Sequence, residues 1–335
     1  MKKIRVFPLI FLLCLVLSGA APGAYALDDP TLPAEAVLLA DLDTGEIIYE
    51  KNMNERRSPA SLTKIMTGLL AVEALDNGQC SMTDMVTAGQ DCLTGLGDDS
   101  SNSGIMPGET MSFKDLFYCA MIHSANEACN VLATYISGSI SAFVEQMNKR
   151  AEELGCTDTH FLDPNGLSND GHYTTAHDLY LITREALKHP DFMTACNTVY
   201  YETEATNMNP PRQMYNSNAL LTSGGYYGDS YVYDGAAGVK TGYTRAAGYC
   251  LVSTAQKNSI NALAIVMGCS GQLNSGADWN GEYNNFVSSI TLYDWLFDNF
   301  SYRTILDSAS FGEKVHVDLA EGDGMFTIRP EGNVT

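Results

Sequence analysis

Three short motifs, each holding residues able to do acyl-transfer chemistry, occur in order along the 335-residue chain: residues 61–64 (Ser-Leu-Thr-Lys), 124–126 (Ser-Ala-Asn) and 240–242 (Lys-Thr-Gly). The first places a hydroxyl three residues before an amine, which puts both on one face of a helix. A serine hydroxyl is a poor nucleophile until a neighbouring base takes its proton. The set predicts a serine nucleophile, two proton-carrying lysines and a strand that holds the substrate.

Ser61 is the expected nucleophile and Lys64 its expected base. Ser61 follows Pro59-Ala60 and precedes a long apolar helical pattern, so it falls in the first turn, where free N–H groups favour developing negative charge. A lysine acts as a base only when burial or a neighbouring cation lowers its pKa. Lys240 is the expected neighbouring cation.

Neither of the first two motifs is specific by itself, and the order of the three carries the argument. Ser-x-Asn also occurs at residues 100–102, in a polar loop with no helix to fix it, and at residues 259–261, in an expected turn after the third motif. Ser124 instead falls between two apolar helices, where a loop can point into a cleft. Gly242 ends an expected strand and lets a substrate backbone approach the sheet edge.

The expected elements suggest an α+β fold, with an antiparallel sheet flanked by helices and a helical subdomain. Two strands surround the turn at residues 43–45, and helices follow residues 61, 112, 126, 140 and 175. The expected later strands are residues 235–241, 248–253 and 262–267, and residues 288–300 form an amphipathic helix. Two further strands, 312–319 and 325–329, are expected to open a C-terminal β-rich domain.

The histidines and cysteines do not predict a metal site. His172 and His177 are five residues apart, the wrong spacing for two ligands on one helix face. We expect His172 to pack in a turn and His123 to face away from the cleft, so a Ser-His-Asp triad is not expected. The sequence has no Cys-x-x-Cys pair; Cys80 and Cys92 flank a turn-rich region and are the candidates for a bridge. No metal and no cofactor are expected.

The charge balance excludes one class of partner. The chain has 19 Lys and Arg against 40 Asp and Glu, a formal net charge of −21. Such a chain is not expected to bind nucleic acid through a basic patch.

The first 26 residues resemble a secretory signal peptide. A basic start is followed by an apolar run at residues 7–17 and by small residues at 24–26, so cleavage is expected after Ala26. A lipoprotein site at Cys14 and an uncleaved anchor are the alternatives. The expected organisation is a signal peptide at 1–26, a catalytic domain at 27–303 and a partial C-terminal β-rich domain at 304–335, in an exported protein of the cell envelope.

From about Ala36 to Phe300 the chain resembles the low-molecular-mass penicillin-binding proteins, the serine-type D-Ala-D-Ala carboxypeptidases. The matching stretches are SPASLTKIMTGLLAVEAL, HSANEACNVLA, FVEQMNKRAEELGCTDTHFLDPNGL, HYTTAHDL and GVKTGYTRAAGYCL. The resemblance implies a β-lactamase/transpeptidase-like fold. It also implies removal of the terminal D-Ala from peptidoglycan stem peptides, with inhibition by β-lactams.

The resemblance also implies catalytic roles. Ser61 would form the acyl-enzyme and Lys64 would take its proton. Ser124 and Lys240 would relay protons to the leaving D-alanine and from the attacking water. The backbone N–H groups of Ser61 and Tyr243 would form the oxyanion hole.

Substrate-binding roles follow by the same resemblance. Asn126 would hydrogen-bond the substrate amide. Thr241 would bind the terminal carboxylate, with Lys240 supplying positive charge and Gly242 leaving room at the strand.

The chain departs from the family pattern in two places. Glu127 stands where Asp is usual, a change expected to affect a surface or local hydrogen bond. Some members carry a basic residue soon after the strand that here ends in Met267-Gly268, where this chain has residues 269–271 (Cys-Ser-Gly). That leaves open which cation, beyond Lys240, anchors the substrate carboxylate. The C-terminal region that often lies on the membrane in this family is not expected to be complete here.

Two other functions stay open on the sequence. Class A-like β-lactamases share the three elements but use a glutamate before the third motif to activate water, and the corresponding stretch DPNGLSNDGHY has none. A catalytically silent wall-binding or β-lactam-sensing protein is the other alternative. The third stem residue, lysine or diaminopimelate, is also left open.

Overall fold

The computed structural model describes residues 27–97, 100–167, 170–221, 227, 229–276 and 280–302, and the backbone of two short strands, Glu313–His316 and Met325–Ile328. The expected signal peptide lies outside the described residues. The chain divides into two units, residues 1–31 and 32–335, and every element below belongs to the second unit. None of the described helices is long and apolar enough to cross a membrane.

A five-stranded antiparallel sheet forms the centre of the fold, with the strand order β2-β1-β9-β8-β7. Its strands are β1 (Ala36–Asp41), β2 (Ile47–Lys51), β7 (Ala236–Thr244), β8 (Gly248–Lys257) and β9 (Ile260–Cys269). The N-terminal hairpin joins the C-terminal strands through β1 and β9, where Leu38 lies opposite Ile265. This pairing leaves β7, the strand of the third motif, at the sheet edge.

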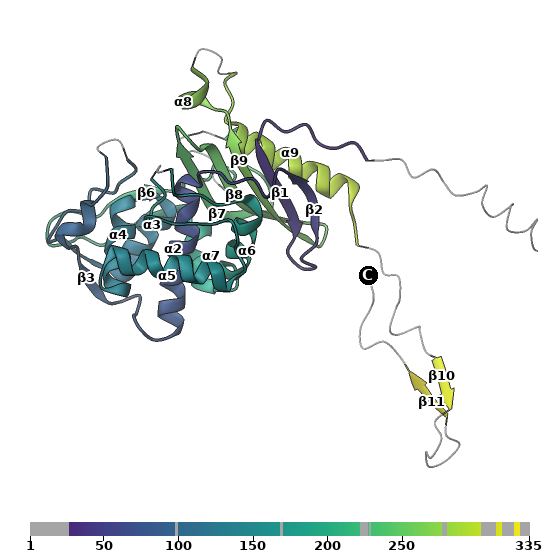
Figure 1. Cartoon of the computed structure of the whole chain (residues 1–335), viewed down its shortest axis with the longest axis horizontal. Coiled ribbons are helices and arrows are strands. Elements are labelled where there is room, and N and C mark those ends of the chain that lie inside the picture. The colour runs from purple at the N-terminus through teal and green to yellow at the C-terminus, as the bar shows by residue number, and fades with distance from the viewer. Residues whose placement is uncertain are drawn as a thin grey trace, which may run out of the picture. The chain divides into compact units, whose positions relative to one another are not determined.

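Both faces of the sheet are covered, and alternate residues of one strand serve different cores. In β1 all six residues are buried; Leu38 belongs to the core beneath the helical region, while Val37 and Leu39 belong to the core beneath α9 (Asn284–Asn299). Figure 1 shows α9 against one face of the sheet and the other long helices gathered on the opposite side. An alternating strand with two apolar faces is what a sheet between two helical layers requires.

The helical region is built around one buried helix, α2 (Lys64–Asp76), in which ten residues are buried. A helix that is apolar all round belongs in a core. The helices packed around it are α3 (Phe113–Ile122), α4 (Asn126–Ser137), α5 (Ile140–Glu153), α6 (Ala176–Ala186) and α7 (Pro190–Asn197). The smaller elements are η1 (Ala60–Thr63), η2 (Gln90–Leu93), α8 (Gln272–Ser275), and the strand pairs β3 (Met85–Thr87) with β4 (Thr110–Ser112) and β5 (Tyr200–Glu202) with β6 (Gln213–Tyr215).

The expected α+β architecture and the antiparallel sheet are confirmed. Ser112 and Thr175 cap α3 and α6 as expected, since each side chain accepts a hydrogen bond from the backbone N–H three residues on. The sheet strands β7, β8 and β9 are longer than expected, and α7 was not foreseen. β10 (Glu313–His316) and β11 (Met325–Ile328) pair as an antiparallel hairpin.

All eight described cysteines are free thiols, so Cys80 and Cys92 do not form the bridge considered above. Seven of the eight are buried and Cys80 is partly exposed. They serve as small apolar residues of the core.

Candidate active site

A cavity of about 1000 Å³ lies where the edge strand β7 meets the helical region. Six of the eight predicted site residues line it: Ser61, Ser124, Asn126, Thr241, Gly242 and Tyr243. The other two, Lys64 and Lys240, are 0% and 2% exposed. The structure therefore gathers the three motifs around one cavity, although they lie far apart along the chain.

 Lys64 and Asn126, for example, are 62 residues apart along the chain, yet their side chains form a hydrogen bond of 2.7 Å.

Ser61 and Lys64 meet because the helix begins with a tight turn. Residues Ala60–Thr63 form a 3₁₀ turn and the α-helix starts only at Lys64, one turn later than expected from the sequence. In a 3₁₀ turn, side chains three residues apart eclipse each other. The Lys64 Nζ accordingly lies 2.8 Å from the Ser61 Oγ, which confirms the predicted pairing of hydroxyl and amine.

The Lys64 amine lies among three oxygen atoms. Besides Ser61, its Nζ lies 2.7 Å from the Asn126 Oδ1 and 2.8 Å from the backbone oxygen of Asn165. Both of these oxygens can only accept, so they take two N–H groups. In its neutral form the amine then has its lone pair left for the Ser61 hydroxyl, whereas in its protonated form it donates a third N–H to the Ser61 Oγ. In the neutral form, Lys64 can take the proton of Ser61.

Burial lowers the pKa values of both lysines of the site. Burial lowers the pKa of the Lys64 amine below its ordinary value. Burial, and secondly the positive charge of Lys64, lower the pKa of Lys240 to about 7. Two amines buried near each other cannot both hold a proton without a large cost. Lys240 is thus able to carry a proton at neutral pH and to release it.

The turn at residues 163–167 holds the backbone oxygen that Lys64 contacts. The Asp163 carboxylate accepts hydrogen bonds from the N–H groups of Asn165 and Gly166. Burial raises the pKa of Asp163, but His172 in the first place, and these two N–H groups after it, hold that pKa below its ordinary value. Gly166 has a φ of +87°, and a Cβ there would lie 1.8 Å from the backbone oxygen of Ala60. Only glycine lets this turn lie against the turn that carries Ser61.

Strand β7 packs against the same turn from the other side. A Cβ at Gly242 would lie 3.2 Å from the backbone nitrogen of Ser61, so glycine avoids a tight contact between β7 and the turn of the nucleophile. The expected role of Gly242, which was to leave room for the substrate, stays a prediction. Next to it, the hydroxyls of Thr241 and Ser217 are 2.5 Å apart and both line the cavity.

Hydrogen bonds connect the Ser-Ala-Asn corner at residues 124–126, and Glu127 after it, to the loop at residues 100–105. Ser124 has a φ of +60°, an unusual conformation for a residue other than glycine, and it starts the turn into α4. The backbone N–H of Asn126 donates to the oxygen of Ser101, at 2.9 Å. Buried Glu127 accepts from the N–H groups of Ser103 and Ile105 at 2.5 and 3.2 Å. Glu127 therefore positions the loop 100–105 rather than lying at the surface.

Comparison with known proteins agrees with this geometry. The family model described as D-alanyl-D-alanine carboxypeptidase matches residues 24–271. The chain belongs to this family.

Several relatives support the assignment to the carboxypeptidase family. The chain is 38% identical over 265 residues to the D-alanyl-D-alanine carboxypeptidase DacF of Bacillus subtilis, covering 77% of this chain and 65% of that protein. It is 32% identical over 329 residues to DacC of Escherichia coli, covering 94% of this chain and 76% of that protein. The chain thus spans about two thirds to three quarters of the length of these two relatives.

A solved structure shares the fold. The ampicillin-bound form of penicillin-binding protein D2 from Listeria monocytogenes is 25% identical, with a TM-score of 0.65, covering 80% of this chain and 98% of that chain. The β-lactamase/transpeptidase-like fold expected for the family is therefore confirmed.

Some expectations about the cavity were wrong, and some of its residues were missed. His123 lines the cavity instead of facing away from it. Ser100 and Ser101, set aside as part of a chance match in a polar loop, line it as well. Ser217 and Asn165 were not foreseen, because nothing in their local sequence distinguishes them from other loop residues. Within the described residues, Ser124 forms no side-chain hydrogen bond to either lysine, so its predicted relay role stays a prediction.

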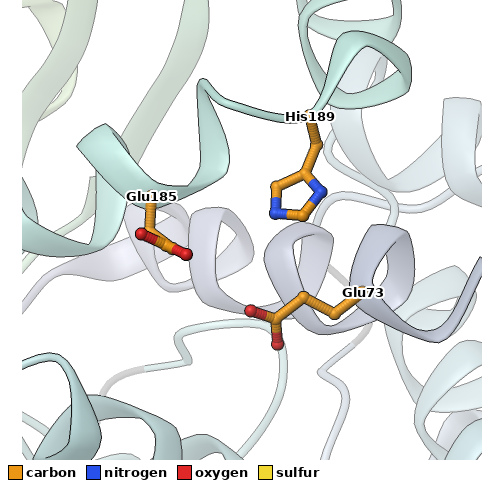
Figure 2. A group of neighbouring side chains, drawn as sticks. All are labelled: Glu73, Glu185 and His189. Atoms are coloured by element: carbon orange, nitrogen blue, oxygen red, sulfur yellow. The ribbon is translucent and has the colours of Figure 1, made fainter. Parts of the chain in front are cut away.

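One cluster outside the cavity has the residue types of a metal site. Figure 2 shows Glu73, Glu185 and His189, whose nearest side-chain atoms all lie within 4.8 Å of one another. Arg150 bonds to Glu73 at 2.7 Å and to Glu185 at 3.2 Å, and Glu185 also pairs with Lys188 at 2.6 Å. Because protein cations already neutralise both carboxylates, we interpret the cluster as an ion-pair network between α2, α5 and α6.

The buried Lys240 predicts a pH dependence of stability. Between its folded pKa of about 7 and its ordinary value of 10.5, the unfolded chain holds a proton that the folded chain does not. The free energy of unfolding should then rise with pH, by about 1 kcal/mol from pH 7 to pH 8. Lys240→Met should lose most of that increment. Urea unfolding of both proteins at the two pH values measures it, and an equal rise in both would contradict the assignment.

Gly166 predicts a loss of reactivity by displacement of the turn. In Gly166→Ala the new methyl group meets the oxygen of Ala60, so the Asn165 contact to Lys64 is lost and acylation of Ser61 should slow roughly 100-fold. Gly155→Ala is the matched control, because Gly155 has a φ of +84° with no atom within 4 Å of a Cβ. It should cost about 1–2 kcal/mol of stability without slowing acylation. Equal acylation rates in the two variants would refute the role of the turn.

Proposed function

We propose that this protein is an exported D-alanyl-D-alanine carboxypeptidase, which removes the terminal D-Ala from peptidoglycan stem peptides through an acyl-enzyme on Ser61. The observation that carries the proposal is the 2.8 Å contact between the Ser61 Oγ and an amine whose other two contacts are acceptors. Membership of the carboxypeptidase family supports the choice of substrate.

Acylation follows from the positions of Ser61 and Lys64. The Ser61 Oγ attacks the carbonyl carbon between the two D-alanines as its proton passes to the Lys64 Nζ. The carbonyl oxygen becomes an oxyanion, which the N–H groups of Ser61 and Tyr243 stabilise. The C–N bond then breaks, a proton reaches the leaving amine through Ser124 and Lys240, and D-alanine departs.

Substrate binding uses the edge strand and the Ser-Ala-Asn corner. The terminal carboxylate binds the hydroxyls of Thr241 and Ser217, with the amine of Lys240 supplying positive charge when it is protonated. Because the Asn126 Oδ1 already accepts from Lys64, its Nδ2 is the group left for the substrate amide oxygen.

Deacylation in this proposal uses the lysines and not a carboxylate. No Asp or Glu occurs among the described residues that line the cavity. In the turn at 163–167, where a class A-like β-lactamase would be expected to carry its glutamate, Lys64 contacts a backbone oxygen of Asn165. This favours a carboxypeptidase that β-lactams acylate and inhibit over a β-lactamase. The complete set of catalytic side chains also argues against a silent site.

Export belongs to the same proposal, since stem peptides lie outside the cytoplasm. It is supported by the signal-peptide features of residues 1–26. Contact with the membrane through a C-terminal region remains an expectation from the family.

The nucleophile can be tested by intact-mass spectrometry after incubation with benzylpenicillin. The wild-type protein should gain one stable penicilloyl adduct, and Ser61→Ala should gain none, because the attacking oxygen is absent. Ser58→Ala, which changes a nearby serine that does not line the cavity, should react like the wild type.

The same proteins should be assayed for D-alanine release from a stem pentapeptide. Release by the wild type and by Ser58→Ala, with loss in Ser61→Ala, is the expected result. Unchanged release in Ser61→Ala would refute the mechanism. Rapid hydrolysis of penicillin without an adduct would instead indicate a β-lactamase.

A further inference from the structure

The cavity extends past Tyr243 to a side chain whose charge the proposed reaction does not use. Arg245 lines the cavity and is exposed, in the turn between β7 and β8. It forms no hydrogen bond or ion pair with another described residue. Each of the other five described arginines has a polar side-chain partner: Arg56 with Asp158, Arg57 with Glu55, Arg150 with Glu73, Arg184 with Tyr180, and Arg212 with Glu109.

The backbone at Arg245 is held in place while its side chain is not. The Ala247 N–H donates to the Thr244 hydroxyl at 3.1 Å and closes the turn. Thr244 pairs with Gly248 at the end of the two strands. In a chain with a net charge of −21, an unpaired arginine at the rim of a cavity without described carboxylates is a site for a negative group of the substrate.

The direction of the substrate decides which negative group this is. The nucleophile lies beside Gly242, and the terminal carboxylate is assigned to Thr241, on one side of it. The acyl part of the peptide must then leave in the other direction, along Tyr243 and Thr244. Arg245 is three residues from Gly242, or roughly 10 Å along the strand. This is the region of the third stem residue, one residue before the D-alanine that is acylated.

Two further features of the cavity suit the side chain of the third stem residue. Tyr243 and Tyr249 line this part of the cavity with their ring centroids 4.4 Å apart, and offer an apolar wall to methylene groups. The Asn285 Oδ1 is buried and has no hydrogen-bond partner among the described residues, and Asn285 also lines the cavity. A buried acceptor of this kind needs a donor.

We propose that Arg245 is a specificity-determining residue that binds the free carboxylate of diaminopimelate at the third stem position. The ammonium on the same carbon supplies the donor for Asn285, and the methylenes lie on the tyrosines. A lysine side chain has the ammonium but no carboxylate for Arg245. The inference rests on the proposed carboxypeptidase function and adds the class of stem peptide to it.

The test compares three pentapeptides that differ only at the third residue: meso-diaminopimelate, the same residue with its free carboxylate amidated, and L-lysine. For the wild type, kcat/KM for D-alanine release should be roughly tenfold higher with the free carboxylate than with the other two. Arg245→Gln should remove that preference and leave the rates on the amidated and lysine peptides unchanged. Arg245→Lys should keep part of it.

Two controls separate this role from the alternatives. Lys257→Gln makes the same change of charge at the far end of β8 and should keep the wild-type preference. Acylation by benzylpenicillin, which has no third residue, should be equal in the wild type and Arg245→Gln. An equal loss on all three peptides, together with slower acylation, would mean that Arg245 binds the terminal carboxylate, and would overturn the inference.

The same measurements distinguish a wrong inference about Arg245 from a wrong proposed function. Equal rates of D-alanine release from the three peptides by the wild type overturn the inference and leave the carboxypeptidase in place. No release from any peptide, by a protein that still forms the benzylpenicillin adduct, overturns the proposed function and the inference with it.

Discussion

The structure of the site depends on the contacts of one buried amine. Lys64 is fully buried, and its nitrogen meets the hydroxyl of Ser61, the side-chain oxygen of Asn126 and the backbone oxygen of Asn165. These three groups come from the start of the central helix, the corner before α4 and the turn at 163–167. Burying an amine is unfavourable unless its hydrogen bonds are satisfied, and loss of one partner costs about 1–3 kcal/mol. The same contacts that make the lysine tolerable in the core therefore hold the three segments around the nucleophile.

The charge of the molecule gives this local arrangement a second role. The chain is strongly acidic, so its long-range field does not attract an anionic peptide. Salt screens that repulsion beyond about 8 Å at physiological ionic strength, which leaves the groups at the cavity to determine binding. There the described lining is free of carboxylates, with Arg245 at the rim and Lys240 buried behind Thr241. An acidic protein can thus bind a carboxylate substrate through a few cations placed at the cavity itself.

Sequence alone predicted the parts of the site that follow from local periodicity. The spacing of Ser61 and Lys64, the edge position of the third motif and the caps of α3 and α6 are set within a few residues, and all were found. Asn165, Ser217 and the loop at 100–105 were not found, because they reach the cavity only through the packing of distant segments. The expectation that His123 faces away from the cavity was wrong for the same reason, because the sequence beside Ser124 does not determine the direction of the corner. Gly166 stood in a recognised turn, but its need for glycine comes from Ala60, 106 residues earlier.

The absence of a carboxylate among the described lining residues bears on why a β-lactam would inhibit this site while a peptide is turned over. With a peptide, the C–N bond breaks and D-alanine diffuses away, so water can approach the ester from the side that the leaving group occupied. In a β-lactam the nitrogen that leaves is part of a ring and stays attached to the acyl group, where it blocks that approach. An enzyme with a carboxylate on the opposite side could still activate a water there. With an asparagine backbone oxygen at the turn and lysines as the proton carriers, water has the route of the leaving group, and the penicilloyl ester should persist.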